Sequence, residues 1–154
     1  MKIENKQWHK ITWTIVLFVL GLISAANFVM AAPNSGVLVA SENSIVSQEK
    51  ILEIRRIYLG LPASPESSIN ASVINLSDKF VYKQFLKNIM HMTEKGYQRK
   101  MVKRVFRLGS RRLKEFTSKD DLVKHLIDNP GEVSFMEKTV AERTQGIKVV
   151  QVLW

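Results

Sequence analysis

Short apolar runs alternate with segments of helical periodicity from residue 36 onward, which predicts a domain of strands and helices. Four runs are typical of strands: Gly36–Ala40, Ser72–Leu76, Glu132–Met136 and Ile147–Leu153. The first run is apolar at successive positions, as in a strand that is covered on both faces. We therefore expect the first strand at or near the centre of a buried sheet.

Four helices are predicted between these strands. With their capping residues, they cover Gln48–Leu59 (Ser47), Asp78–Met92 (Ser77), Glu94–Phe106 (Thr93) and a short segment that opens at Ser118. Gly60 supplies the left-handed end of the first helix. In the third, Tyr97, Met101 and Val105 form the face that we expect to turn inward, and we expect Phe106 to turn inward as well. Asn129-Pro130-Gly131 ends the last helix.

Strands that alternate with helices imply an α/β domain with a mainly parallel sheet flanked by helices. In such sheets, ligands bind at the carboxyl ends of strands, where helix amino termini also point. This rule places Ser41–Ser44 and Leu76–Phe80 near any binding site.

Residues 1–31 have the order of a secretory signal peptide. They comprise a basic start at Lys2, Lys6 and Lys10, an uninterrupted apolar run at Ile15–Ile23 and a small-residue cleavage pattern at Val29–Ala31. The alternative is an uncleaved inner-membrane anchor, but a span needs about 20 mainly apolar residues, and Ser24 and Asn27 interrupt this segment. We expect export to the periplasm, which leaves one domain at residues 32–154.

The amino-acid composition limits the classes of partner that we expect for this domain. The 154 residues include no cysteine, 23 Lys+Arg and 14 Asp+Glu, for a net charge of +9. Such a surplus of basic residues can indicate a protein that binds nucleic acid. An exported chain, however, first meets anionic lipid, cell-wall polymers and small anions. We therefore expect no nucleic-acid partner and regard an anionic membrane surface as one candidate. Without disulfides, stability must come from a hydrophobic core.

Several segments occur in an order that indicates a known family. They are Ile51–Gly60 (ILEIRRIYLG), Asn75-Leu76 before a helix at Phe85, Tyr97–Gly109 (YQRKMVKRVFRLG) and Leu122–Met136 (LVKHLIDNPGEVSFM). Together they resemble the small exported phosphate-transporter-substrate-binding-like proteins, a compact branch of the type 2 periplasmic binding fold. The resemblance implies a fold like one lobe of such a protein. It also implies binding of phosphate or another solute, with an ABC importer or a membrane sensor as partner.

Two departures from the family pattern concern ligand binding. Large members cradle the anion with a Ser-Gly-Thr-type turn after the second strand, and small members often keep a Gly-Ser pair there, where this chain has Lys79-Phe80. The chain is also about as long as a single lobe. It can therefore offer an open anion site but cannot enclose a ligand between two lobes.

A small-anion site would use backbone N–H groups at a helix amino terminus together with one arginine. The candidate ligand-binding residues are Ser77 and Asp78, at the start of the second predicted helix, and Ser110 and Arg111. The alternative for Ser77 is helix capping alone, and for Arg111 it is solvation at the surface.

The stretch from Lys95 to Lys114 contains nine basic residues and no acidic one. It is either a solvated helix face followed by a basic loop, or a docking patch for anionic lipid, polymer or an acidic partner protein. The candidate docking residues are Arg99, Lys103, Arg104 and Arg107. Aromatic residues are sparse in this stretch, which argues against binding of single-stranded nucleic acid.

Catalytic motifs are absent from the sequence. His9, His91 and His125 lack the spacing of a metal site, and there is no nucleophile elbow, phosphate-binding loop or dinucleotide fingerprint. We expect neither an enzyme nor a cofactor or metal. The sequence predicts a periplasmic solute-binding-like protein that binds a small anion and passes it, or its signal, to a membrane partner. The alternative is an adaptor that docks through the basic stretch.

Overall fold

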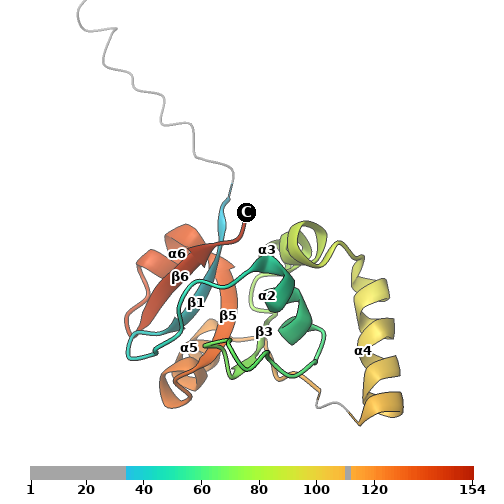
Figure 1. Cartoon of the computed structure of the whole chain (residues 1–154). Helices are drawn as coiled ribbons and strands as arrows, with labels where there is room; N and C mark the ends of the chain where they lie inside the picture. Colours follow the sequence, from blue (N-terminus) through green and yellow to red (C-terminus); the bar gives the residue numbers. More distant parts are fainter. Residues whose placement is uncertain (1–33, 110–111) are drawn as a thin grey trace, which may run out of the picture. The chain divides into compact units, whose positions relative to one another are not determined.

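The computed structural model describes residues 34–109 and 112–154 (Figure 1). The predicted signal segment and two candidate ligand residues, Ser110 and Arg111, lie outside the described residues. The elements are β1 (Gly36–Ser41), α2 (Ile51–Tyr58), β2 (Ala71–Ser72), β3 (Ile74–Asn75), α3 (Lys79–Phe85), the π-helical turn η1 (Leu86–Met90), α4 (Glu94–Leu108), β4 (Glu115–Phe116), α5 (Lys119–Asp128), β5 (Glu132–Glu137), α6 (Lys138–Glu142) and β6 (Ile147–Val152). Within these ranges, no helix has the length and apolar character that a membrane span requires.

The four-stranded sheet has the order β2-β5-β1-β6. Every residue of β1 is buried, so its continuous apolar sequence correctly predicted an interior strand. β1 runs antiparallel to both neighbours, whereas β2 runs parallel to β5. The domain is therefore mixed α/β, and the prediction of a mainly parallel sheet is not confirmed.

The direction of β1 accounts for this difference. β5 and β6 point the same way because β1 is antiparallel to each, and β2 shares their direction through its pairing with β5. α6 connects β5 to β6, and β1 occupies the place between them. An alternating order of strands and helices predicts the common direction of β2, β5 and β6. Hydrophobic periodicity does not reveal that an antiparallel strand is inserted between two of them.

The predicted second strand is divided at Val73. Its first part, β2, pairs with β5, and its second part, β3, pairs with β4 in a separate two-stranded sheet. The side-chain amide of Asn75 donates to the carbonyl oxygen of Phe135 at 3.0 Å and holds the small sheet to β5. The chain that leads to Ser77 therefore leaves from the small sheet rather than from the edge of the main one.

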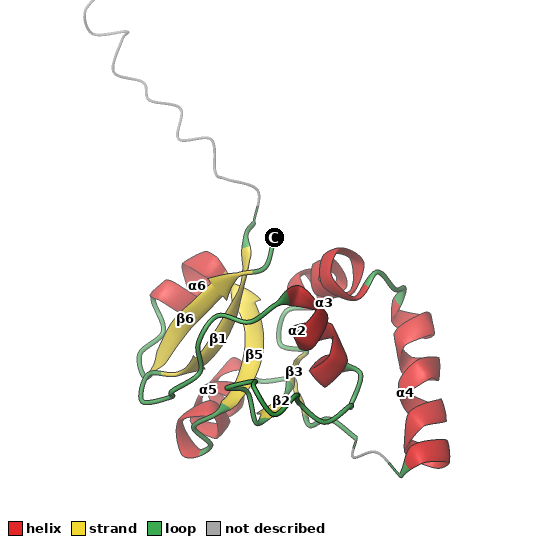
Figure 2. Cartoon of the chain, viewed as in Figure 1, coloured by secondary structure: helices red, strands yellow, loops and turns green. Residues whose placement is uncertain are grey.

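Helices cover both faces of the main sheet (Figure 2). In β1, Leu38 and Ala40 belong to the core cluster that includes α2 and α3, whereas Val37 and Val39 belong to the cluster that includes α5 and α6. This alternation is the two-residue period of a strand. Burial on both sides explains why the strand has no polar position before Ser41.

Stacked aromatic rings join the helices to one face of the sheet. Phe85 of α3 lies on Phe135 of β5 with ring centroids 4.0 Å apart and an interplanar angle of 4°. Tyr58 of α2 is tilted against both, at 4.7 and 5.8 Å. All three side chains are fully buried, and rings of this size each remove about 150–250 Å² from water. This cluster fixes α2 and α3 on the sheet.

Capping was predicted correctly for two helices and wrongly for two others. Thr93 caps α4 and Ser118 caps α5, as expected. Ser47 does not cap α2, because its backbone N–H donates to Ser68 and the helix begins only at Ile51. Ser77 does not cap α3, because Asp78 takes that role. At α3 the neighbouring carboxylate of Asp78 takes the helix amides, whereas no side chain caps α2.

Candidate functional site

The start of α3 is closed to an anion by the protein's own carboxylate. Asp78 Oδ1 accepts hydrogen bonds from the backbone N–H groups of Phe80, at 2.8 Å, and Val81, at 3.0 Å. Ser77 points to Asn75 instead, and both its backbone N–H and its hydroxyl donate to Asn75 Oδ1. The donors expected to hold phosphate are therefore already bonded, and a phosphate placed there would be repelled by Asp78.

A hollow of about 360 Å³ lies beside Ser77. Thr117 and Lys119 contribute a hydroxyl and a cation to its lining, and Asp78 and Glu137 contribute two carboxylates. The structure thus brings Ser77 and Asp78 together with a lysine that the sequence analysis did not single out. Lys119 opens α5 directly after its cap and is exposed.

The four predicted docking residues all lie on α4. Arg99, Lys103 and Arg107 are exposed, and Arg104 is half-buried. With Lys95 and Lys100 they make six cations on one helix, whose sole acidic residue is Glu94 in the first turn. Across residues 34–109 and 112–154, no ion pair involves any of these six cations.

Among the described side chains, Tyr97 and Met101 attach α4 to the core of the domain. The Tyr97 hydroxyl donates to the backbone carbonyl oxygen of Tyr58 at 2.6 Å, and Tyr97 and Met101 are 2% and 7% exposed within the core cluster. Tyr97 lies in the first half of the helix and Met101 at its middle. Figure 1 shows α4 at the edge of the domain, apart from the four-stranded sheet.

The remaining surface of α4 has two chemically different sides, because successive residues of a helix are turned by about 100°. The apolar side consists of Val102, Val105 and Phe106, and the basic side consists of Arg99, Lys100, Lys103, Arg104 and Arg107. Phe106 is 85% exposed and Val102 is 53% exposed. The expectation that Phe106 turns inward is therefore wrong. Nine residues separate it from Tyr97, which places the two side chains on opposite sides of the helix.

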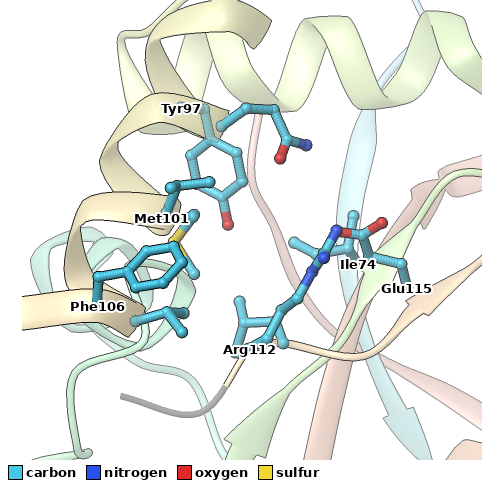
Figure 3. A pocket seen from close by; sticks show the side chains of 10 residues that line it. Ile74, Tyr97, Met101, Phe106, Arg112 and Glu115 are labelled. Atoms are coloured by element: carbon cyan, nitrogen blue, oxygen red, sulfur yellow. The ribbon is translucent and has the colours of Figure 1, made fainter. Parts of the chain in front are cut away.

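An apolar cleft of about 210 Å³ continues the apolar side of α4 toward β3 and β4 (Figure 3). In Figure 3, Tyr97, Met101 and Phe106 border it on the α4 side, opposite Ile74, Arg112 and Glu115. Arg112 and Glu115 form an exposed ion pair at 3.5 Å. The amino-acid pattern does not predict this cleft, because the cleft requires β3 and β4 to pair.

A second hollow, of about 300 Å³, lies on the basic side and is lined by Lys100, Lys103, Arg104 and Arg107. The Arg104 Nη1 nitrogen is buried and has no hydrogen-bond partner among the described residues. Buried guanidinium N–H groups normally find an acceptor, since leaving one unbonded costs about 1–3 kcal/mol or more. The hollow therefore brings four cations together, which suits an anionic ligand.

The two histidines of the described chain lie apart in different environments. His91 Nε2 is bonded to the Arg55 guanidinium, and His125 Nε2 lies 2.8 Å from a Glu132 carboxylate oxygen. In the part of the chain that the structure describes, no group of three or more His, Asp or Glu side chains could hold a metal ion.

Tyr97→Phe tests how α4 is attached. Burial, with smaller effects from Tyr82 and Glu115, raises the pKa of Tyr97 well above its usual value. The unfolded chain releases this proton above about pH 10, whereas the folded chain keeps it. The contribution of Tyr97 is therefore complete below that pH and is lost as the pH rises further, by about 1.4 kcal/mol per pH unit.

We expect Tyr97→Phe to lower the free energy of unfolding by about 1–2 kcal/mol at neutral pH, because the Tyr58 carbonyl loses its donor. Above pH 10 the variant should lose stability less steeply than the unaltered protein. Urea unfolding between neutral pH and pH 11 measures both effects. Equal slopes for the two proteins would show that the hydroxyl is not buried against Tyr58.

Comparison with protein families and curated proteins identified no relative of this chain. No protein-family model matches the chain, and no curated protein matches it at a significant level. The resemblance to substrate-binding proteins therefore stays a prediction. The features on which a function can be argued are the two sides of α4 and the hollow beside Ser77.

Proposed function

We propose that this protein is a non-enzymatic interaction module of the cell envelope that docks onto an anionic surface through α4. The observation that carries this proposal is the set of six cations on α4, none of which forms an ion pair within the described residues. The envelope location rests on the predicted signal segment, which lies outside the described residues.

The spacing of these cations has an energetic cost in the free protein. Arg99, Lys103 and Arg107 follow one another at intervals of four residues, and Lys100 and Arg104 do the same. Like charges at this interval destabilise a helix by about 0.2–0.5 kcal/mol per pair. An anionic partner would offset this repulsion, and the local field of the cluster would speed its approach.

The position of α4 favours docking over a purely solvated surface. Its described buried residues, Tyr97 and Met101, lie on one side, so the side that carries Arg99, Lys103 and Phe106 is open to a partner. An exposed aromatic side chain, Phe106, stands beside the cations. Together with Val102, which is also exposed, Phe106 gives a partner an apolar contact beside the cations.

Charge reversal on α4 tests the proposal. In the triple variant Arg99→Glu, Lys103→Glu, Arg107→Glu, the net charge falls from +9 by six units to +3. We expect its retention on an immobilised polyanion such as polyphosphate to be lost at a salt concentration of about 0.1 M, where exposed charges still act over about 10 Å. Elution by a salt gradient measures the effect.

The control is a triple variant of equal net charge, Lys50→Glu, Lys124→Glu, Arg143→Glu. These three residues are exposed and lie outside α4. The control should elute close to the unaltered protein, and circular dichroism should show the same fold for all three proteins. If the two triple variants elute together, binding follows net charge and α4 is not the docking site.

Weak small-anion binding beside Ser77 is a second candidate function. It is favoured by the hollow that Ser77, Thr117 and Lys119 line and by the resemblance to phosphate-binding proteins. It is opposed by Asp78, whose carboxylate occupies the helix amides. The site would then use side-chain donors, with Lys119 as the charged one.

Phosphate at millimolar concentration should raise the melting temperature of the protein above its value in chloride of equal ionic strength. Stabilisation by a ligand follows mass action, so the shift should grow with phosphate concentration. Lys119→Ala should abolish this shift, and Lys124→Ala, an exposed lysine later on the same helix, should leave it intact. Identical melting temperatures in the two salts would exclude this candidate.

A further inference from the structure

We infer that the anionic surface is a phospholipid bilayer, on which α4 lies with its apolar side in the headgroup region and its basic side against lipid phosphates. This inference rests on the proposed function and names its partner. It is carried by two features on adjoining sides of one helix: the exposed apolar residues Val102 and Phe106, and the exposed cations Arg99 and Lys103 beside them.

The apolar side of α4 has the form of an interfacial contact. Val102 and Phe106 are one helical turn apart and are both mostly exposed, so they reach outward together. Val105 extends the same surface into the apolar cleft. Interfacial helices bury such a strip at the boundary between headgroups and acyl chains, while basic residues flank it.

The basic side provides a seat for phosphate. Lys100, Lys103, Arg104 and Arg107 surround one hollow, and the buried Arg104 Nη1 has no partner among the described residues. A guanidinium group matches the geometry of a phosphate oxygen pair, and three further cations add charge. The exposed cations Arg99, Lys103 and Arg107 would attract anionic headgroups to this side of the helix.

The composition of the face favours lipid over an acidic protein or a nucleic acid. Three of the six cations on α4 are lysines, Lys95, Lys100 and Lys103. Lysine is depleted from protein interfaces because its ammonium group is strongly hydrated, whereas it commonly contacts membrane phosphates. A single-stranded nucleic acid would need several stacking rings, and among the described residues of α4 Phe106 is the one exposed aromatic side chain.

A fluorescent label on α4 tests the inference in the full chain. The protein has no cysteine, so Val102→Cys gives one site for an environment-sensitive dye. The matched control is Ile45→Cys, since Ile45 is 88% exposed and lies on the segment before α2. Each protein is mixed with vesicles of phosphatidylcholine alone or of an equimolar mixture of phosphatidylcholine and phosphatidylglycerol.

We expect the label at residue 102 to shift to the blue on the anionic vesicles and to change much less on the neutral ones. The label at residue 45 should not shift. Adding Arg99→Glu, Lys103→Glu and Arg107→Glu to the residue-102 protein should weaken partitioning roughly a hundredfold. Phe106→Ser should weaken it about tenfold without a change in the salt dependence. Residues 1–33 are the same in every variant, so their contribution cancels.

Retention on polyphosphate separates the failure of this inference from the failure of the proposed function. If α4-dependent retention persists but the label at residue 102 does not respond to anionic vesicles, the partner is a soluble polyanion or an acidic protein, and the bilayer is excluded. If α4-dependent retention is also absent, the docking function fails with it. Equal blue shifts at residues 45 and 102 would likewise overturn the inference, because the contact would not be specific to α4.

Discussion

The stack of Phe85 on Phe135 is the contact on which the arrangement of helices depends. It joins α3 to β5, and Tyr58 brings α2 to the same point. The backbone carbonyl of Tyr58 accepts a hydrogen bond from the hydroxyl of Tyr97. This is the one hydrogen bond described between α4 and this cluster. The position of α4 therefore depends on α2, because Tyr97 of α4 is bonded to Tyr58 of α2. Tyr58 is itself packed against the ring stack in the centre of the domain.

This chain of contacts explains why one helix differs from the others. α2 and α3 bury their apolar residues against the sheet, and α5 does so on the opposite face through Leu122 and Leu126. α4 buries Tyr97 and Met101, between its start and its middle, and exposes Val102 and Phe106 on another side. A helix with few buried apolar contacts belongs to the less stable part of a domain, and this is where a binding surface costs the fold least.

Much of the fold follows from the sequence, and the limits have physical causes. The buried strand at Gly36–Ala40, the caps at Thr93 and Ser118 and the left-handed conformation of Gly60 depend on local patterns, and all are observed. The direction of β1 and the division at Val73 depend on pairing between distant segments. Apolar periodicity contains no such information. The short elements β4 and α6 were missed because five residues or fewer give too little periodicity.

For the candidate sites too, the features that depend on local patterns could be predicted, and those that depend on contacts between segments could not. The candidate docking residues could be singled out because charge is visible in a sequence, and helical spacing places Arg99, Lys103 and Arg107 on one side. Helical spacing alone would also have placed Phe106 opposite Tyr97. The capture of the α3 amides by Asp78 was not foreseen, because Ser77 and Asp78 are both good capping residues. Which of them caps the helix is decided by Asn75, which binds Ser77 from the strand before it.

Hydrogen exchange of the full chain with and without anionic vesicles tests the central claim most directly, since it reports every helix at once. The account predicts that amides of α4 (residues 94–108) are among the faster helical amides in the free protein and become protected on vesicles. Those of α5 (residues 119–128) should not change. Protection of α5 or α3 with no change in α4 would contradict the account, because the binding surface would then lie elsewhere on the domain.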